Sequence, residues 1–378
     1  MATNASTHTN PGSFIRFSIL LLGLTPMSHG FVEVYRGSLT LDLNARVIYD
    51  DNVGGNALGV SDTLFSFRPT LNYRRDVGRS NIRASLGYDF SRYQDFDSFD
   101  FNDYNASLSV DVPVAAGSKY SGTFRVSRNQ DSGSDQSLLR RVQTVNTRLT
   151  FDSVYAVGAR TGLRLGLGYN KQEPEGFSST TNNDIRVGVQ YQLRSVNALF
   201  LDYRYRTAES DGGVDNASNG VFFGLSRPLG GKVSGSVSVG YENTTAKGIA
   251  VEDETRWLLN ANVSWTPREF TRFNLRVSQD LYADTLNQSV DRSSVDVSMN
   301  QDLGQRFTLD LRAAYNWYDF QGDTGRKDEV LDLTARLNYS FNSRLTAMTE
   351  YEFTDSSSNV SLAGYTRNRV SLSVSYEF

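Results

Sequence analysis

Residues 306–317 read RFTLDLRAAYNW and alternate apolar with polar side chains along almost their whole length. Successive side chains of a β-strand point to opposite faces. This stretch therefore predicts a strand with Leu309 and Leu311 on one face. The other face carries Asp310 and Arg312, so it needs water or charged partners rather than an apolar core.

Almost every segment beyond residue 37 shows the same alternation, and a helical period is nearly absent. Eighteen such segments are separated by turn residues. They are 38–50, 63–74, 81–92, 103–114, 119–128, 143–152, 160–170, 184–194, 198–206, 219–227, 232–242, 255–266, 271–282, 292–301, 306–318, 329–341, 344–354 and 367–378. The alternation is interrupted in 143–152 and 292–301, so sixteen strands are the alternative count.

The connections between these segments alternate in length. Short ones lie at 77–80, 115–118, 228–231 and 342–343, and longer ones rich in Asp, Ser, Gly and Asn lie at 50–62, 129–140, 171–183, 207–218, 243–254 and 355–366. Tight turns on one rim and longer loops on the other are typical of an outer-membrane barrel with periplasmic turns and extracellular loops. We therefore predict an all-β fold, a single antiparallel transmembrane β-barrel of about 18 strands in the cell outer membrane.

Aromatic spacing separates a membrane barrel from a soluble β-sandwich, β-helix or propeller, which also contain many alternating strands. Phe65 and Tyr73 lie at the two ends of one apolar face, and Trp257 and Trp265 lie at the ends of another. Eight residues of a tilted strand rise roughly 20 Å, close to the apolar band of about 25 Å between the aromatic girdles of a membrane barrel. This spacing favours the membrane barrel.

Composition excludes several classes of function. The 378 residues are 39% apolar, 12% aromatic and 21% charged, and their mean hydropathy of −0.42 is too polar for a bundle of membrane helices. Cysteine is absent, and the two histidines are His8 and His29. Without its first thirty residues the chain therefore has no Ser-His or Cys-His nucleophile, no thiolate or imidazole metal site, no haem ligand and no disulfide. The net charge of −4 and the lack of a basic run argue against nucleic-acid binding.

We accordingly expect no enzyme activity, no cofactor and no metal. A hydrolase that uses only carboxylates is the one enzymatic alternative, since two carboxylates suffice for glycoside hydrolysis, but no acidic pair stands out from the others.

Residues 14–24 read FIRFSILLLGL, an apolar run of the length of a signal-peptide core that is too short to span a bilayer as a helix. Ser28 and Gly30 are small residues at the −3 and −1 positions of a cleavage site. We predict a signal peptide at 1–30 and an outer-membrane barrel at 31–378, whose 348 residues carry a net charge of −5 because Arg16 is the only charge lost. A buried N-terminal strand or helix is the alternative.

The last eight residues read SLSVSYEF and resemble the C-terminal signal strand of Gram-negative outer-membrane proteins. The resemblance rests on Val374, Tyr376 and Phe378 at alternate positions of an otherwise polar strand. It implies that Tyr376 and Phe378 form the assembly signal and that the barrel assembly machinery is a partner.

A second resemblance lies in the first hairpin, which contains Tyr49-Asp50-Asp51-Asn52-Val53, then Ser61-Asp62-Thr63, then Arg68-Pro69-Thr70-Leu71. These residues are similar to the opening of a β-barrel porin family found beside exopolysaccharide biosynthesis systems. The remainder of the chain matches that family only as a barrel pattern. The resemblance implies passage of a secreted exopolysaccharide through the outer membrane, together with periplasmic polysaccharide-export proteins.

Arginine dominates the polar face, which we assign to the barrel lumen. The candidate lumen-lining residues are Arg46, Arg68, Arg83, Arg125, Arg148, Arg164, Arg186, Arg204, Arg256, Arg276, Arg312 and Arg336, with Arg272, Arg306 and Arg344 on the same face. A guanidinium binds carboxylates bidentately, so these residues either guide an anionic polymer or pair with acids of neighbouring strands and stiffen the wall. Inward aromatic residues are limited to Phe200 and Phe222, which disfavours a track for neutral sugars.

Two alternatives to an exopolysaccharide conduit stay open, a general diffusion porin for small solutes and a structural or adhesive surface barrel without transport. The longest loops have about twelve residues, so narrowing of the pore must come from inward side chains, loop tips or segment 31–37. The outer loops are acidic at Asp50, Asp51, Asp95, Asp97, Asp100, Asp103, Asp211, Asp215, Glu252, Asp253 and Glu254. We interpret these acids as solvated loop charge rather than as Ca²⁺ or Mg²⁺ ligands at the lipopolysaccharide layer.

Overall fold

The structure is a computed structural model. It describes residues 32–34, 37–112, 120–135, 140–193, 197–211, 215–226, 232–247, 254–283, 289–321 and 325–378. The expected signal peptide at 1–30 lies outside these residues, as do Glu252 and Asp253 of the acidic loops.

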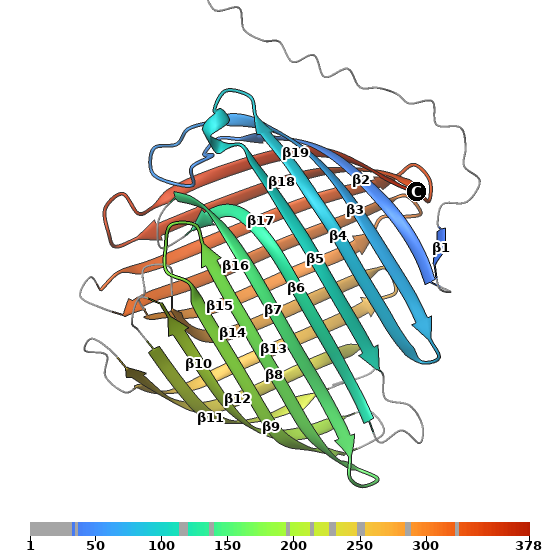
Figure 1. Cartoon of the computed structure of the whole chain (residues 1–378), viewed down its shortest axis with the longest axis vertical. Coiled ribbons are helices and arrows are strands. Elements are labelled where there is room, and N and C mark those ends of the chain that lie inside the picture. The colour runs from blue at the N-terminus through green and yellow to red at the C-terminus, as the bar shows by residue number, and fades with distance from the viewer. Residues whose placement is uncertain are drawn as a thin grey trace, which may run out of the picture.

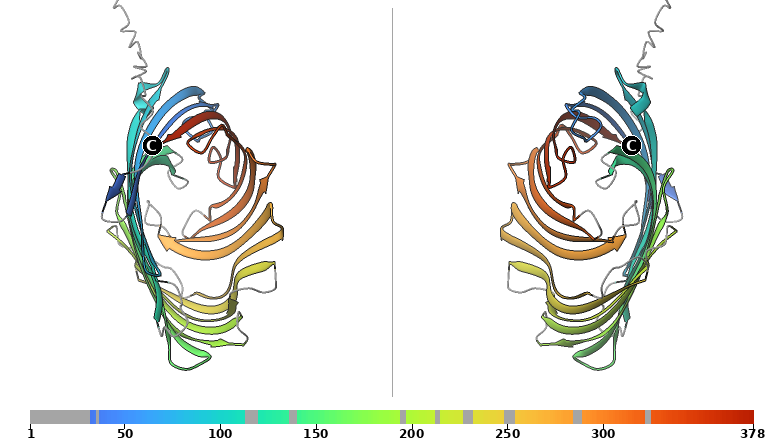
Figure 2. Two further views of the ribbon diagram at one scale, coloured as in Figure 1. Left: turned by 90° about the vertical axis from the view of Figure 1, so that its right-hand side faces the viewer. Right: turned by 90° about the vertical axis from the view of Figure 1, so that its left-hand side faces the viewer.

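Eighteen long antiparallel strands form one sheet, and each strand pairs with the strands before and after it in the sequence. The sheet contains β1 Val32–Val34, β2 Gly37–Asp50, β3 Asp62–Val77, β4 Ser80–Tyr93, β5 Phe101–Val112, β6 Tyr120–Asp135, β7 Arg140–Ala156, β8 Thr161–Pro174, β9 Thr180–Gln192, β10 Ala198–Ser210, β11 Asp215–Ser226, β12 Val233–Lys247, β13 Glu254–Arg268, β14 Thr271–Ala283, β15 Ser289–Asp302, β16 Phe307–Gln321, β17 Lys327–Ser340, β18 Leu345–Ser358 and β19 Tyr365–Glu377. Figure 1 shows the strands inclined side by side, and Figure 2 shows that they close into a flattened ring. The predicted closed barrel of eighteen strands is confirmed, including the two strands with interrupted alternation.

The last strand closes the ring against the first long strand. β19 pairs with β2 from Glu377 opposite Asp42 to Arg369 opposite Asp50. The Phe378 N–H extends this ladder by donating to the Leu41 carbonyl at 2.9 Å. The short β1 pairs with Gly37–Leu39, the part of the β2 edge that β19 does not reach. Closure pairs the edges that an open sheet would leave exposed.

Apolar side chains cover the outside of the barrel between two rows of aromatic rings. Leu311 is 39% exposed in the middle of its strand, and Trp257 is 69% exposed toward one end. The rings of Tyr241 and Trp257 lie 5.1 Å apart at that end, and those of Trp265 and Phe273 lie 5.3 Å apart at the other. An exposed apolar belt bounded by aromatic girdles is the outer surface of a membrane barrel, which excludes the soluble β architectures.

The inside of the ring is polar. Its most buried side chains include Asp202, Glu242 and Glu350, each 2% exposed or less. A small apolar cluster lies at the loop end, where Ile48, Val53, Leu64 and Tyr93 pack together with Phe99 and Phe101 beneath the β2–β3 and β4–β5 loops. The only helix among the described residues is the short 3-10 turn Asp97–Phe99, and none is long or apolar enough to cross a bilayer.

Several strands continue beyond the ends expected from the sequence. β6 extends to Asp135, β8 to Pro174 and β12 to Lys247, so the expected loops at 129–140, 171–183 and 243–254 are shorter than predicted. The alternation stops where the strand leaves the membrane, but the backbone ladder continues because main-chain groups still pair with those of the neighbouring strand.

Candidate functional site

The candidate site is the inner wall of the barrel, and strand alternation puts the arginines on it. Along β2, for example, Val47 and Tyr49 are exposed on the outside, whereas Ile48 and Asp50 are buried on the inside. Arg46 shares the face of Ile48 and Asp50 and contacts Ser371 at 2.9 Å. The remaining candidate arginines occupy the same face of their own strands.

Nine of the twelve candidate arginines form ion pairs within the wall. The pairs are Arg46 with Glu350, Arg68 with Asp89, Arg125 with Asp111 (3.3 Å), Arg164 with Asp202 (3.3 Å), Arg186 with Asp152, Arg204 with Asp184, Arg256 with Glu242 (3.6 Å) and Asp291 (2.6 Å), Arg312 with Asp296 (2.5 Å), and Arg336 with Glu350. Most of the candidate arginines therefore have an acidic partner in the wall itself, which is the stiffening arrangement.

Some of these pairs reach across an intervening strand, and a glycine on that strand makes room. Arg164 on β8 reaches Asp202 on β10 across β9, where a Cβ added to Gly188 would lie 2.0 Å from Asp202 Oδ1. Arg186 on β9 reaches Asp152 on β7 across β8, where a Cβ at Gly166 would lie 2.7 Å from Arg186 Nη2. Glycine at both positions keeps the path of the guanidinium clear.

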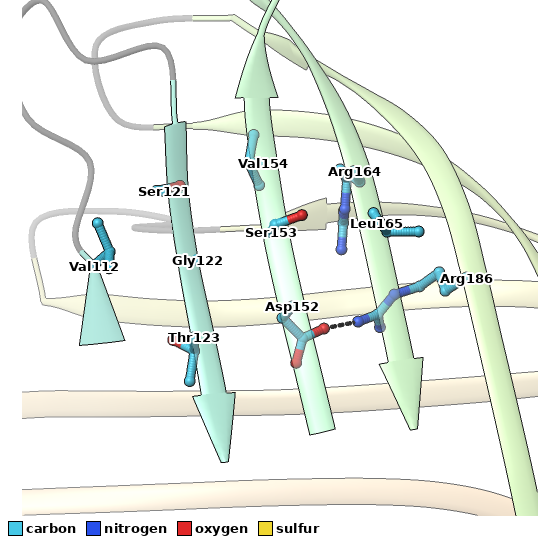
Figure 3. Close-up of a pocket in the computed structure, with 10 residues that line it drawn as sticks. All are labelled: Val112, Ser121, Gly122, Thr123, Asp152, Ser153, Val154, Arg164, Leu165 and Arg186. Atoms are coloured by element: carbon cyan, nitrogen blue, oxygen red, sulfur yellow. Dashed lines mark hydrogen bonds and ion pairs between the residues drawn. The ribbon is translucent and has the colours of Figure 1, made fainter. Parts of the chain in front are cut away.

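These crossed pairs border a pocket of about 310 Å³ in the wall, shown in Figure 3. Thr123, Asp152, Arg164 and Arg186 line it with polar groups, and the Asp152–Arg186 pair lies at one edge. The Arg164 guanidinium carbon also lies 4.1 Å from the centre of the Phe200 ring. A guanidinium held by an acid and by an aromatic face is fixed in position.

Three candidate arginines have no ionic partner among the residues that the structure describes. Arg83, Arg148 and Arg276 are exposed and form no ion pair with another residue of the described ranges. Arg276 lies opposite Asp296 in the β14–β15 ladder, but that carboxylate is bonded to Arg312. These three guanidinium groups are available to a solute.

Several charged groups of the inner wall are absent from the candidate set. Arg206 pairs with the fully buried Glu242, and Arg367 and Arg369 both pair with the buried Asp50. Arg206 follows Arg204 at the next inward position of one strand, so the alternation itself carried that signal. Arg367 and Arg369 lie at the same two-residue spacing before the inward Ser371 and Ser373, so the alternation of β19 also puts them on the inner face.

The expectation that Phe200 and Phe222 are the only inward aromatic residues is wrong. Tyr93 and Phe320 are buried on the inner face, and Tyr318 shares the face of Phe320. Tyr93 and Phe320 lie beyond the strand ends predicted from the sequence. The alternation therefore assigned neither residue to a face.

The outer acids near the first hairpin are not solvated charge, which corrects the expectation for Asp50 and Asp51. Asp50 is 2% exposed and bonds Arg367, while Asp51 accepts hydrogen bonds from the backbone and side chain of Asn368. Asp62 is 4% exposed and accepts the N–H groups of residues 95 and 96. Asp50 and Asp51 thus join the β2 end to β19, and Asp62 joins the β4–β5 loop to β3. Buried carboxylates of this kind are bonded in folded proteins. Asp95 and Asp97 are exposed as expected, and the described residues contain no acidic group arranged to hold a metal ion.

One family of known proteins matches part of this chain. The family model described as "Putative beta-barrel porin 2" matches residues 216–378, which run from β11 to the last residue. No curated protein sequence matches the chain.

The chain is also similar, at low identity, to solved outer-membrane proteins. OpdK of Pseudomonas aeruginosa is 11% identical with a TM-score of 0.45, covering 90% of this chain and 99% of its own. OccAB4 of Acinetobacter baumannii is 13% identical with a TM-score of 0.45, covering 92% and 99%. OccK2 (OpdF) of Pseudomonas aeruginosa, solved in complex with glucuronate, is 14% identical with a TM-score of 0.48, covering 93% and 100%. The family match covers the C-terminal strands, and the closed barrel with its apolar belt is that of an outer-membrane protein.

Proposed function

We propose that this outer-membrane porin conducts an anionic exopolysaccharide chain. The observation that carries the proposal is the set of exposed inward arginines, Arg83, Arg148 and Arg276, that have no ionic partner in the described part of the chain. They lie on β4, β7 and β14, so a chain in the lumen would meet guanidinium groups on widely separated strands of the wall. A guanidinium offers a planar pair of donors to a carboxylate and stays charged at any physiological pH.

In this proposal the paired arginines stabilise the wall and do not bind the polymer. Their charge is neutralised within the wall, and they hold the barrel in shape around the solute. Barrels with this number of strands leave room for an aqueous channel. The resemblance of the first hairpin to the exopolysaccharide-associated family also supports the proposal, although Asp50, Asp51 and Asp62 hold loops rather than line the path.

One observation favours a second candidate, a general diffusion porin. Nine of the twelve candidate arginines are neutralised by acids, and a balanced wall discriminates weakly between small solutes. For either candidate we propose outer-membrane lipid and lipopolysaccharide as the surroundings of the belt, and the barrel assembly machinery as the reader of Tyr376 and Phe378. Periplasmic polysaccharide-export proteins would deliver the polymer.

Single-channel conductance in a planar bilayer tests the proposal. We expect a stable open current that an oligogalacturonate blocks and that a neutral maltodextrin of the same length does not block. Replacing Arg83, Arg148 and Arg276 by Gln should shorten each blockade at least several-fold, because the guanidinium contacts are lost. Arg128→Gln, an exposed position on the outer side of β6, is the matched control and should leave blockade unchanged.

Other outcomes decide between the alternatives. Equal blockade by the neutral and the anionic oligosaccharide would identify a general porin. An inserted barrel without current would identify a structural surface protein.

A further inference from the structure

The two ends of the barrel carry opposite charge in their connections. The described residues between strands at the end that holds Phe378 include five cations and one acid, namely Arg79, Arg160, Lys232, Arg306 and Arg344 against Glu269. The described residues between strands at the other end include one cation and six acids, namely Arg326 against Asp51, Asp95, Asp97, Asp100, Glu175 and Asp211. The short turns mark the first end as periplasmic.

The contrast persists when three strand residues on each side are added. The periplasmic end then has eight cations (Arg75, Arg79, Arg160, Lys232, Arg268, Arg272, Arg306 and Arg344) and six acids (Glu33, Asp76, Asp111, Glu269, Asp302 and Glu377). The outer end has eight cations (Arg92, Arg140, Arg141, Lys247, Arg256, Arg326, Lys327 and Arg367) and eighteen acids (Asp50, Asp51, Asp62, Asp95, Asp97, Asp100, Asp103, Asp135, Glu173, Glu175, Glu209, Asp211, Asp215, Glu254, Asp291, Asp319, Asp328 and Glu329). The acidic excess is therefore confined to the outer end.

Three of the periplasmic cations are exposed and able to act on a solute, whereas the Lys232 ammonium donates to the Pro267 carbonyl at 2.5 Å. Arg79 and Arg160 are exposed, and neither side chain forms an ion pair or hydrogen bond with another residue that the structure describes. Arg306 is exposed, and its guanidinium donates to the Tyr339 hydroxyl at 3.3 Å and forms no ion pair with the residues that the structure describes. The five cations of these connections lie in five different turns, so they are distributed around the mouth rather than gathered on one side.

We infer that a polyanionic chain is captured at the periplasmic mouth and is repelled from the outer mouth. The inference rests on the proposed function, because it requires an anionic polymer as the solute. Cations around a mouth raise the local concentration of an anion and its rate of entry, and acids lower both. The effect acts within about a Debye length of the rim, roughly 8 Å at physiological salt. A passive channel has no energy source, so the asymmetry selects the mouth that captures the chain and does not drive it through.

The test needs barrels of known orientation in a planar bilayer. The sequence contains no cysteine, so Leu58→Cys places one thiol in the outer β2–β3 loop, where Leu58 is 84% exposed. A biotin attached there reports the outer side when streptavidin changes the current. Oligogalacturonate is then added to one side at a time, and the frequency of blockade events is counted at low and at high salt.

We expect events from the periplasmic side to be at least about tenfold more frequent at low salt, with the difference shrinking at high salt. The combined variant Arg79→Gln, Arg160→Gln, Arg306→Gln and Arg344→Gln should lower only the periplasmic frequency. The reciprocal variant Asp95→Asn, Asp97→Asn and Glu175→Gln removes exposed outer acids and should raise only the outer frequency. Open-channel conductance, measured in the same records, shows that each variant has inserted as a barrel.

Equal frequencies from both sides, a higher frequency from the outer side, or a periplasmic variant that behaves like the parent would overturn the inference while leaving the proposed function in place. Absence of blockade from either side would overturn both.

Discussion

The outer and periplasmic ends of the barrel differ in whether their charged side chains are buried and bonded or exposed. At the outer end, Asp50 and Asp328 are at most 2% exposed and are bonded to arginines, Asp50 to Arg367 of neighbouring β19 and Asp328 to Arg326 in the adjoining connection. At the periplasmic end, Arg79 and Arg160 are exposed and have no partner among the described residues. Burial therefore separates charges that hold the fold together from charges that remain available to a solute.

The geometry of the connections explains this difference. The outer β2–β3 loop spans residues 51–61, long enough to fold back and bring Asn52 to the Thr366 carbonyl at 2.9 Å. The periplasmic β3–β4 turn has only Gly78 and Arg79 between its strands, and Gly78 adopts a positive φ of 61°. So tight a turn has no chain to spare for covering its own side chains.

The largest expected effect comes from removing a buried outer acid. Asp50→Ala would leave Arg367 and Arg369 without the carboxylate that both contact, and unpairing a buried charge costs about 3–5 kcal/mol. We expect the free energy of unfolding, measured by urea titration in detergent micelles with tryptophan fluorescence, to fall by that amount. A loss below about 1 kcal/mol would break the comparison, since the outer pairs would then be no more important than surface pairs.

The next effect concerns the belt that separates the two ends. Leu311→Arg would place a charge at an outward position in the middle of β16, and this costs about 2–4 kcal/mol in a membrane barrel. Thr334→Arg on the inner face of neighbouring β17 is the matched control and should change the unfolding free energy far less, because the new charge stays in water. Similar losses for both variants in lipid vesicles would contradict the assignment of the two faces.

Deletion of Phe378 tests the pairing of β19 with β2 at the periplasmic end. The Phe378 ring lies 4.6 Å from that of Tyr376, and its N–H bonds to the Leu41 carbonyl. Loss of one ring contact and one hydrogen bond is expected to cost about 1–3 kcal/mol and to lower the yield of assembled barrel. Heat-modifiable migration in gels measures that yield, with Glu377→Gln at the exposed neighbouring position as the control. A normal yield of assembled barrel without Phe378 would show that this residue is not part of the assembly signal.

The smallest effect is expected at the periplasmic rim. Asp76 and Arg74 are 3.8 Å apart with more than 60% of each side chain exposed, so Asp76→Ala should change the unfolding free energy by less than about 0.5 kcal/mol. The same variant makes the mouth more positive and should raise the frequency of blockade by oligogalacturonate from the periplasmic side. A loss of several kcal/mol in the free energy of unfolding would show that exposed periplasmic charges stabilise the fold as much as the buried outer charges do.

Much of the fold could be read from the alternation of residues such as Leu309, Asp310 and Leu311, because one face must meet lipid and the other water. The acidity of the outer loops was also visible. The strand ends were less accurate, since β6 and β12 continue into polar sequence where only backbone pairing defines the strand. The signal peptide at 1–30 stays a prediction.

The sequence by itself determined which side chains face inward, and only the tertiary structure decided which of them are paired. A shift of two residues between neighbouring strands leaves every side chain on its own face but moves a charge about 7 Å along its neighbour. The alternation therefore could not distinguish the bonded Arg164 from the unpartnered Arg148. Pairs such as Arg164 with Asp202 also pass over Gly188 on the strand between them, so they depend on the register of three strands at once.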